Sequence, residues 1–167
     1  VGYSKKIIYR NQSNVNNDIY VTGNLGDSFI GLQVLKNKIK LNKSKTKYFI
    51  NKYYMPDIQN KFSKNLLSLA TSSMDISDGL IADLNKLINK QNVSYKIYEK
   101  SIPVSRNLNN LINSKNLNKI DLVSNGDDYQ ILFTARPNNA RIINKLSKSL
   151  GVKISKIGTI LSGKNKS

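Results

Sequence analysis

The sequence predicts a layered α/β or α+β domain, and three observations lead to this fold class. Short runs with the period-two alternation of a strand take turns along the chain with longer runs whose apolar residues fall at helical spacing. No internal repeat of this pattern is evident. The length of 167 residues suits one domain with a sizeable hydrophobic core.

The first half of the chain predicts one strand followed by three helices. Gly23 and Gly26 are interpreted as turn glycines after the strand, and Asp27 and Asp57 as helix N-caps. The expected elements are a strand at 18–22, a helix from 27 to about 36, a polar loop at 36–47, a helix at 48–54, and a helix from 57 with Ile58, Phe62, Leu66, Leu67 and Leu69 on its buried face.

The second half of the chain predicts a regular alternation of strands and helices. Val93, Tyr95 and Ile97 occupy alternate positions of one expected strand, and Pro137 precedes the last expected helix. The expected elements are a strand ending at 74–77, a helix from 79 to about 92, a strand at 93–98, a loop or helix at 103–113, a strand at 129–135, a helix ending at 150, and one or two strands at 152–160.

Composition excludes several classes of function. The chain has no Cys and no His, which removes disulfides, thiol catalysis, the Ser-His-Asp triad and His-ligated zinc. No run of 18 apolar residues and no signal peptide is visible, so we expect no membrane segment and a cytoplasmic protein. The net charge of +17 suggests nucleic acid, but only four basic residues are Arg and the Lys residues are scattered, so we expect no nucleic-acid partner.

The segment 74–84, MDISDGLIADL, is the most informative part of the chain. Asp75 and Asp78 bracket the hydroxyl of Ser77 where an expected strand passes into an expected helix. Unpaired N–H groups and the helix dipole favour phosphate at such a junction, and the carboxylates could hold Mg²⁺ beside it. The alternative is structural: Ser77 or Asp78 caps the helix and Asp75 accepts turn hydrogen bonds.

Four segments of the chain resemble thiamine-monophosphate kinases in their order and spacing. Segment 74–80 matches M-D-I-S-D-G-L of that family, and 124–134 is similar to its S-G-G-E-D-Y-E-L-L-F-T. Segment 20–28 is similar to Y-V-T-G-T-L-G-D-S, and 151–158 to G-I-x-x-x-x-I-G. The resemblance extends over nearly the whole chain. It implies a mixed β-sheet packed by helices, as in the C-terminal domain of aminoimidazole ribonucleotide synthetase.

The resemblance also implies roles for individual residues. Asp75 and Asp78 match positions that bind Mg²⁺, and Ser77 and Arg10 match positions that contact ATP. The structural alternative for Arg10 is an exposed surface residue. No residue is expected to form a covalent intermediate, because transfer between phosphates depends on charge neutralisation and alignment.

The second candidate site, at 125–130, departs from the family pattern. Asp127 stands where the family has the Glu that contacts thiamine monophosphate, Asn125 replaces a Gly, and Gln130 replaces a Glu. Asp127 keeps the charge on a shorter side chain, so we assign substrate binding to it, beside the alternative of a polar turn before a strand.

For the whole protein, the resemblance implies phosphorylation of thiamine monophosphate by ATP with Mg²⁺. Residues 1–17 would be the tail of an N-terminal domain or a linker, and 18–167 the C-terminal domain. The chain is thus expected to be a fragment, inactive alone, of a homodimer formed through the N-terminal domain. The alternative is a selenophosphate or aminoimidazole ribonucleotide synthetase, but these typically read D-V-T-G or D-I-T-G where this chain has Ser77 and Asp78.

Overall fold

The computed structural model describes residues 7–163, which form five strands and a set of mostly short helices. The strands are β1 (Asp18–Thr22), β2 (Ala70–Asp75), β3 (Val93–Ile97), β4 (Ile131–Ala135) and β5 (Ile154–Ser162). The helices are α1 (Asp27–Leu35), α2 (Lys43–Tyr54), α3 (Asn60–Ser63), α4 (Leu66–Leu69), α5 (Leu80–Leu87), α6 (Arg106–Lys115), α7 (Lys119–Val123) and α8 (Ala140–Leu150), with 3₁₀ turns η1 (Glu99–Ser101) and η2 (Pro137–Asn139).

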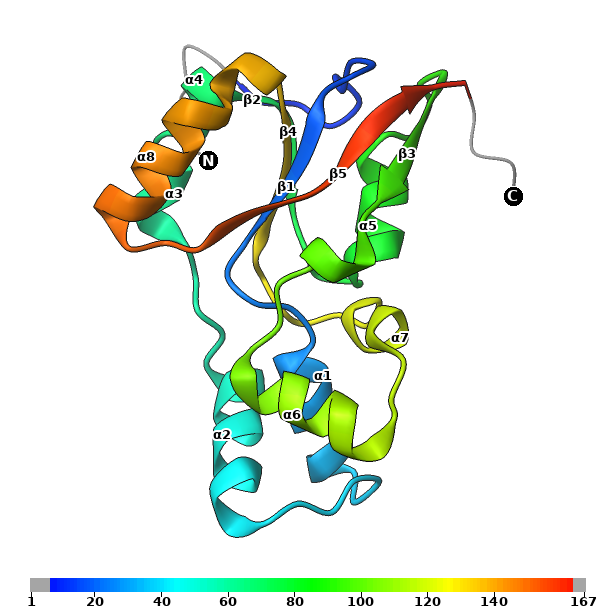
Figure 1. Ribbon diagram of the computed structural model, residues 1–167, viewed down its shortest axis with the longest axis vertical. Helices are drawn as coiled ribbons and strands as arrows, with labels where there is room; N and C mark the ends of the chain where they lie inside the picture. Colours follow the sequence, from blue (N-terminus) through cyan, green and yellow to red (C-terminus); the bar gives the residue numbers. More distant parts are fainter. Residues whose placement is uncertain (1–6, 164–167) are drawn as a thin grey trace.

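The strands make one sheet in the order β2-β4-β1-β5-β3, and this confirms the predicted α+β layered fold (Figure 1). Helices α3, α4 and α8 lie on one side of the sheet and α5 on the other, while α1, α2, α6 and α7 form a helical lobe below it. All four strand pairings are antiparallel. The expectation of a mixed sheet was therefore wrong: the connections reverse the chain direction between every pair of neighbouring strands.

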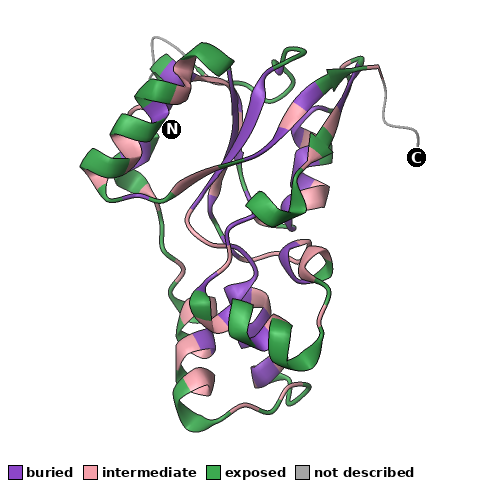
Figure 2. Cartoon of the chain, in the orientation of Figure 1, coloured by how far each residue is buried: buried purple, intermediate pink, exposed green. Residues whose placement is uncertain are grey.

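Three hydrophobic cores hold these layers together, and Figure 2 shows buried residues on both faces of the sheet and inside the helical lobe. Alternate residues of β1 point to opposite faces of the sheet and pack into two different cores. Ile19 and Val21 pack in the core shared with α5, whereas Tyr20 points to the α8 side, where its ring stacks on Phe133 with centroids 5.2 Å apart. The third core is centred on Phe49 and joins α1, α2 and α6.

Most predicted strands and helices are present, but the helix predicted from residue 57 was wrong. The chain forms the separate short helices α3 and α4 there, and the N-cap of α3 is Gln59 rather than Asp57. The Asp57 side chain instead pairs with Lys52. Phe62, Leu66 and Leu69 are buried as predicted, whereas Ile58 and Leu67 are 66% and 39% exposed. Because the helix is interrupted, the three buried side chains can reach the sheet while Ile58 and Leu67 stay exposed.

Other differences from the predicted elements were not visible in the sequence pattern. Helix α2 begins at Lys43, before the predicted start, because the Asn42 side chain accepts from the Lys45 N–H at 3.0 Å. Helix α5 ends at Leu87, five residues earlier than predicted, and α7 was not predicted at all. The segment predicted as a loop or helix at 103–113 is helix α6.

The cap predicted at Asp27 was also wrong. Gly26, with a left-handed φ of 85°, precedes the helix, and no side chain caps it from that position. The buried Asp27 carboxylate instead accepts from the Tyr48 and Ser105 hydroxyls, at 2.8 and 2.7 Å, and so ties α1 to α2 and α6. Across residues 7–163, no helix combines the length and the apolar character that a membrane span requires.

Candidate functional site

The two motifs singled out in the sequence meet in space. Segment 75–79 follows β2, segment 124–130 precedes β4, and we call these two segments together the loop junction. The N–H groups of Asp127 and Tyr129 donate to the carbonyls of Ser77 and Ile76, at 3.0 and 2.8 Å. The Ile76 N–H donates in return to the Gln130 carbonyl at 2.8 Å. Three backbone hydrogen bonds thus fix the positions of two motifs that lie about fifty residues apart in the chain.

Glycines make this close approach possible. A Cβ atom at Gly126 would lie 2.0 Å from the Ser77 carbonyl oxygen, and one at Gly79 would lie 2.2 Å from the Ser124 carbonyl oxygen. Gly79 also has a φ of +112°, a backbone conformation that residues with side chains rarely adopt. Both glycines of the motifs are therefore required by the packing of one loop on the other.

The amide groups at the start of α5 are occupied by the chain itself. One oxygen of Asp83, a fully buried residue, accepts from the N–H groups of Ser77, Asp78 and Gly79 at 2.8, 2.8 and 3.2 Å. The other oxygen accepts from Lys86 Nζ at 2.8 Å. The expectation of unpaired amides that attract phosphate was wrong here, and so was the alternative that Ser77 or Asp78 caps the helix. The sequence signal for this arrangement, which was missed, is Asp83 in the first turn of the predicted helix, where a carboxylate can accept from the preceding N–H groups.

The carboxylates of Asp75 and Asp127 both lie near the same tyrosine, Tyr129. Asp75 is exposed at the end of β2, and Asp127 accepts from the Tyr129 hydroxyl at 3.4 Å. The negative charge of Asp127 is the main cause that raises the pKa of Tyr129, and Asp75 adds to the effect. The structure thus brings these two predicted site residues together.

Asp78 and Arg10 are placed differently. Asp78 is exposed at the loop junction but forms an ion pair with Lys86. Arg10 is exposed, next to Asn11, whose N–H donates to the Leu87 carbonyl at the far end of α5. Because α5 has eight residues and is about 12 Å long, the structure does not bring Arg10 to the loop junction.

The donor set at the loop junction suits Mg²⁺ better than a metal that needs a full protein cage. Within the described part of the chain, no three acidic, His or Cys side chains converge as a metal-binding group. Mg²⁺, however, keeps several waters and takes one or two carboxylates. The carboxylate oxygens of Asp75 and Asp127 fit that requirement, while Asp78 already has a positively charged partner in Lys86.

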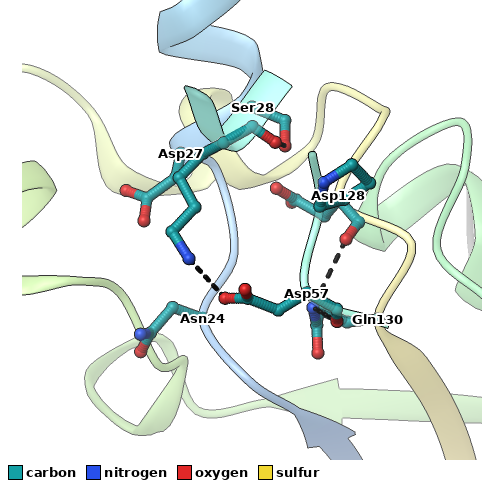
Figure 3. A pocket seen from close by; sticks show the side chains of 8 residues that line it. Asn24, Asp27, Ser28, Asp57, Asp128 and Gln130 are labelled. Atoms are coloured by element: carbon teal, nitrogen blue, oxygen red, sulfur yellow. Dashed lines mark hydrogen bonds and ion pairs between the residues drawn. The ribbon is translucent and has the colours of Figure 1, made fainter. Parts of the chain in front are cut away.

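A second acidic cluster was missed by the sequence analysis. Asp27, Asp57 and Asp128 line a cavity of about 20 Å³, enough for one water, as Figure 3 shows. Burial raises the pKa of Asp128 to about 7, although its carboxylate accepts from the Gly26 N–H at 2.8 Å. Burial also raises the pKa of Asp27. Asp128 is therefore a second carboxylate of the 124–130 segment, but it points into the protein and fixes the start of α1.

The sequence as a whole matches one family. A family model described as "AIR synthase related protein, C-terminal domain" covers residues 14–167. A curated relative from Buchnera aphidicola (subsp. Acyrthosiphon pisum), named thiamine-monophosphate kinase, is 33% identical over 155 residues, which are 92% of this chain and 47% of the relative. The chain spans about half the length of the curated relatives it matches.

Solved structures show the same similarity in three dimensions. The thiamine-monophosphate kinase of Stenotrophomonas maltophilia K279a superposes with a TM-score of 0.84 at 26% identity, over 94% of this chain and 51% of that one. A structure described as AaThiL complexed with AMPPCP and TMP superposes with a TM-score of 0.80 at 27% identity, over 94% of this chain and 48% of that one.

Proposed function

The chain belongs to the AIR synthase related proteins through their C-terminal domain, and from this premise we propose that it is the C-terminal part of a kinase that phosphorylates thiamine monophosphate with ATP and Mg²⁺. The names of the relatives support this activity, and the complex of AaThiL with AMPPCP and TMP supports both ligands. The four matching sequence segments support it independently, since two of them form the loop junction.

The meeting of Asp75 and Asp127 at the loop junction is the observation that carries the proposal. Two phosphorylated molecules repel each other, so the site must neutralise charge and hold both in line. When bound, Mg²⁺ supplies positive charge between the phosphates. Asp75 would hold the metal, and Asp127 would orient the acceptor substrate through that metal or a water. The three backbone hydrogen bonds of the junction would hold the two segments that carry these carboxylates together.

The remaining predicted residues take supporting roles in this proposal. The half-buried Ser77 side chain, which lies between Asp75 and Asp78 in the sequence, would contact the nucleotide. Asp78 would join Asp75 when the metal replaces Lys86 as its positively charged partner. Arg10 would reach ATP only from outside the loop junction, because it lies at the other end of α5.

Activity is expected to need the part of the relatives that this chain does not cover. We therefore propose to assay two proteins for thiamine diphosphate formation from ATP and thiamine monophosphate: the chain alone, and the chain joined to the N-terminal half of the Buchnera relative. The fusion should form product and the chain alone should not. Product from the chain alone would contradict the proposed division of the site, and a folded fusion that binds ATP without forming product would contradict the activity.

Asp75→Asn in the active fusion tests the metal role directly. Losing one charge that aligns phosphates should lower kcat by about 10²–10³, as for other preorganised electrostatic groups. Asp121→Asn, which removes an exposed carboxylate from α7, is the matched control and should leave kcat unchanged. Equal kcat in the Asp75→Asn variant and the control at saturating Mg²⁺ would mean that Asp75 is only a surface residue at the end of β2.

A further inference from the structure

An open cavity of about 490 Å³ lies between the sheet and the helical lobe, away from both acidic clusters. It is bounded by η1, by the first turns of α6 and α7 and by the start of β5. We call it the basic cavity because Lys100, Arg106, Lys119 and Lys153 all line it. It shares no lining residue with the small acidic cavity and includes no residue of the loop junction.

The positive charge of the basic cavity is offset only in part, by the neighbouring Glu99 of η1. No carboxylate lines it, and in residues 7–163 none of its four cations takes part in an ion pair. Lys119 Nζ donates to the Glu99 carbonyl at 3.0 Å, and Lys153 Nζ to the Asn24 side-chain oxygen at 2.8 Å. Both acceptors are neutral, so these bonds hold the ammonium groups in place without forming an ion pair.

Four cations gathered in this way repel one another, and an anion between them would relieve the repulsion. Burial is the main cause that lowers the pKa of Lys119; the negative charge of Glu99 raises this pKa, and the charge of Lys153 lowers it by a smaller effect. The walls also offer neutral donors, since Ser155 and Asn109 line the same space. The apolar segment 102–104 forms part of the wall and would suit the organic part of a ligand.

We propose that the basic cavity binds a small anion that carries two or more phosphate groups. A phosphate monoester has about two negative charges at neutral pH, so two phosphate groups match the four cations. The volume lies in the range of small-molecule sites, roughly 300–1,000 Å³. A nucleic-acid strand fits less well, because only one of the four cations is Arg and an extended basic groove with stacking aromatic rings is missing from the lining. This site is separate from the proposed kinase site and does not depend on that activity.

The test is calorimetric titration of the chain with inorganic pyrophosphate at fixed ionic strength. Arg106→Gln with Lys119→Gln removes two charges from the basic cavity. Lys43→Gln with Arg141→Gln removes one Lys and one Arg from exposed positions on α2 and α8, so both double variants carry the same net charge. Circular dichroism verifies that each variant is folded.

The cavity variant should bind pyrophosphate at least about tenfold more weakly than the unaltered chain, because each charge-assisted hydrogen bond accounts for about a factor of ten. The control variant should stay within about twofold, and orthophosphate should bind more weakly than pyrophosphate to the unaltered chain. An equal loss in both double variants would show that net charge alone attracts the anion and would overturn the proposal. So would tight binding of a single-stranded RNA that the cavity variant loses while pyrophosphate fails to bind.

Discussion

At the scale of single residues, Asp83 is the side chain on which the loop junction most depends. It is fully buried, and its carboxylate accepts three backbone N–H groups and the Lys86 ammonium. Without it, three amides at the start of α5 would lose their acceptor in a place that water reaches poorly. The position of Ser77 and Asp78 is therefore determined by a residue outside the two segments of the loop junction.

We expect Asp83→Ala to lower the free energy of unfolding by about 3 kcal/mol, because hydrogen bonds to a buried charge are lost together. Urea denaturation would measure this. Asp121→Ala, which removes an exposed carboxylate from α7, should change the stability by less than about 0.5 kcal/mol. Similar values for the two variants would show that the three amides find water as a replacement partner.

Asp128 should make the stability of the chain depend on pH. Its pKa is raised from 3.8 to about 7 by burial, so between these values the folded chain binds a proton that the unfolded chain releases. The contribution of Asp128 to stability should therefore be greatest below about pH 4, fall as the pH rises through 7, and level off above it.

Asp128→Asn keeps an acceptor for the Gly26 N–H but cannot ionise. It should be more stable than the unaltered chain at pH 8, by about 2–4 kcal/mol, and nearly equal to it at pH 4. Thermal denaturation at the two pH values would measure the difference. A stabilisation that is the same at both would mean that the Asp128 carboxylate has an ordinary pKa.

The loop junction contains Asp75, Ser77, Asp78 and Asp127, whose roles stay predictions. Sequence reasoning predicted all four from local motifs. It missed Asp83, Asp27 and Asp128 as structural acceptors, because their partners lie on other turns or elements and leave no periodic pattern in the chain.

At the scale of elements, the contact between the two loops decides the site. Gly79→Ala should destabilise the chain by several kcal/mol, because its Cβ would meet the Ser124 carbonyl oxygen and its φ is unfavourable for Ala. Gly151→Ala has a positive φ of 63° but open space around it, so it should cost only about 1–2 kcal/mol. Urea denaturation compares the two. Equal losses of stability in the two variants would show that the two segments of the loop junction can move apart without lowering the free energy of unfolding.

The same scale shows which elements a sequence can predict. Strand β1 was found at its true bounds, since the four β-forming residues 19–22 stand between a polar segment and Gly23. The region 57–69 failed, because its helical spacing is real but its apolar residues are distributed over two short helices that meet the sheet separately. Contacts with the sheet determine where α3 ends and α4 begins, and such contacts leave no trace in the spacing of apolar residues along the chain.

At the scale of the whole molecule, the sheet should be the most stable unit. Strand β1 is paired on both sides and all five of its residues are buried, whereas α2 has Phe49 as its one buried residue. Native-state hydrogen exchange should therefore find the slowest amides in β1 and β4 and faster exchange in α2. Slower exchange in α2 than in β1 would place the most stable core in the helical lobe.

The strand order has a consequence for how a ribosome produces this fold. Strand β1 is among the first described segments to be synthesised, yet both of its neighbours, β4 and β5, come from the last forty residues of the chain. At ordinary rates of translation, β1 waits roughly ten seconds or more for its partners. The sheet can close only after β5 has left the exit tunnel, and until then an apolar strand with two unpaired edges is open to chaperones or to other nascent chains.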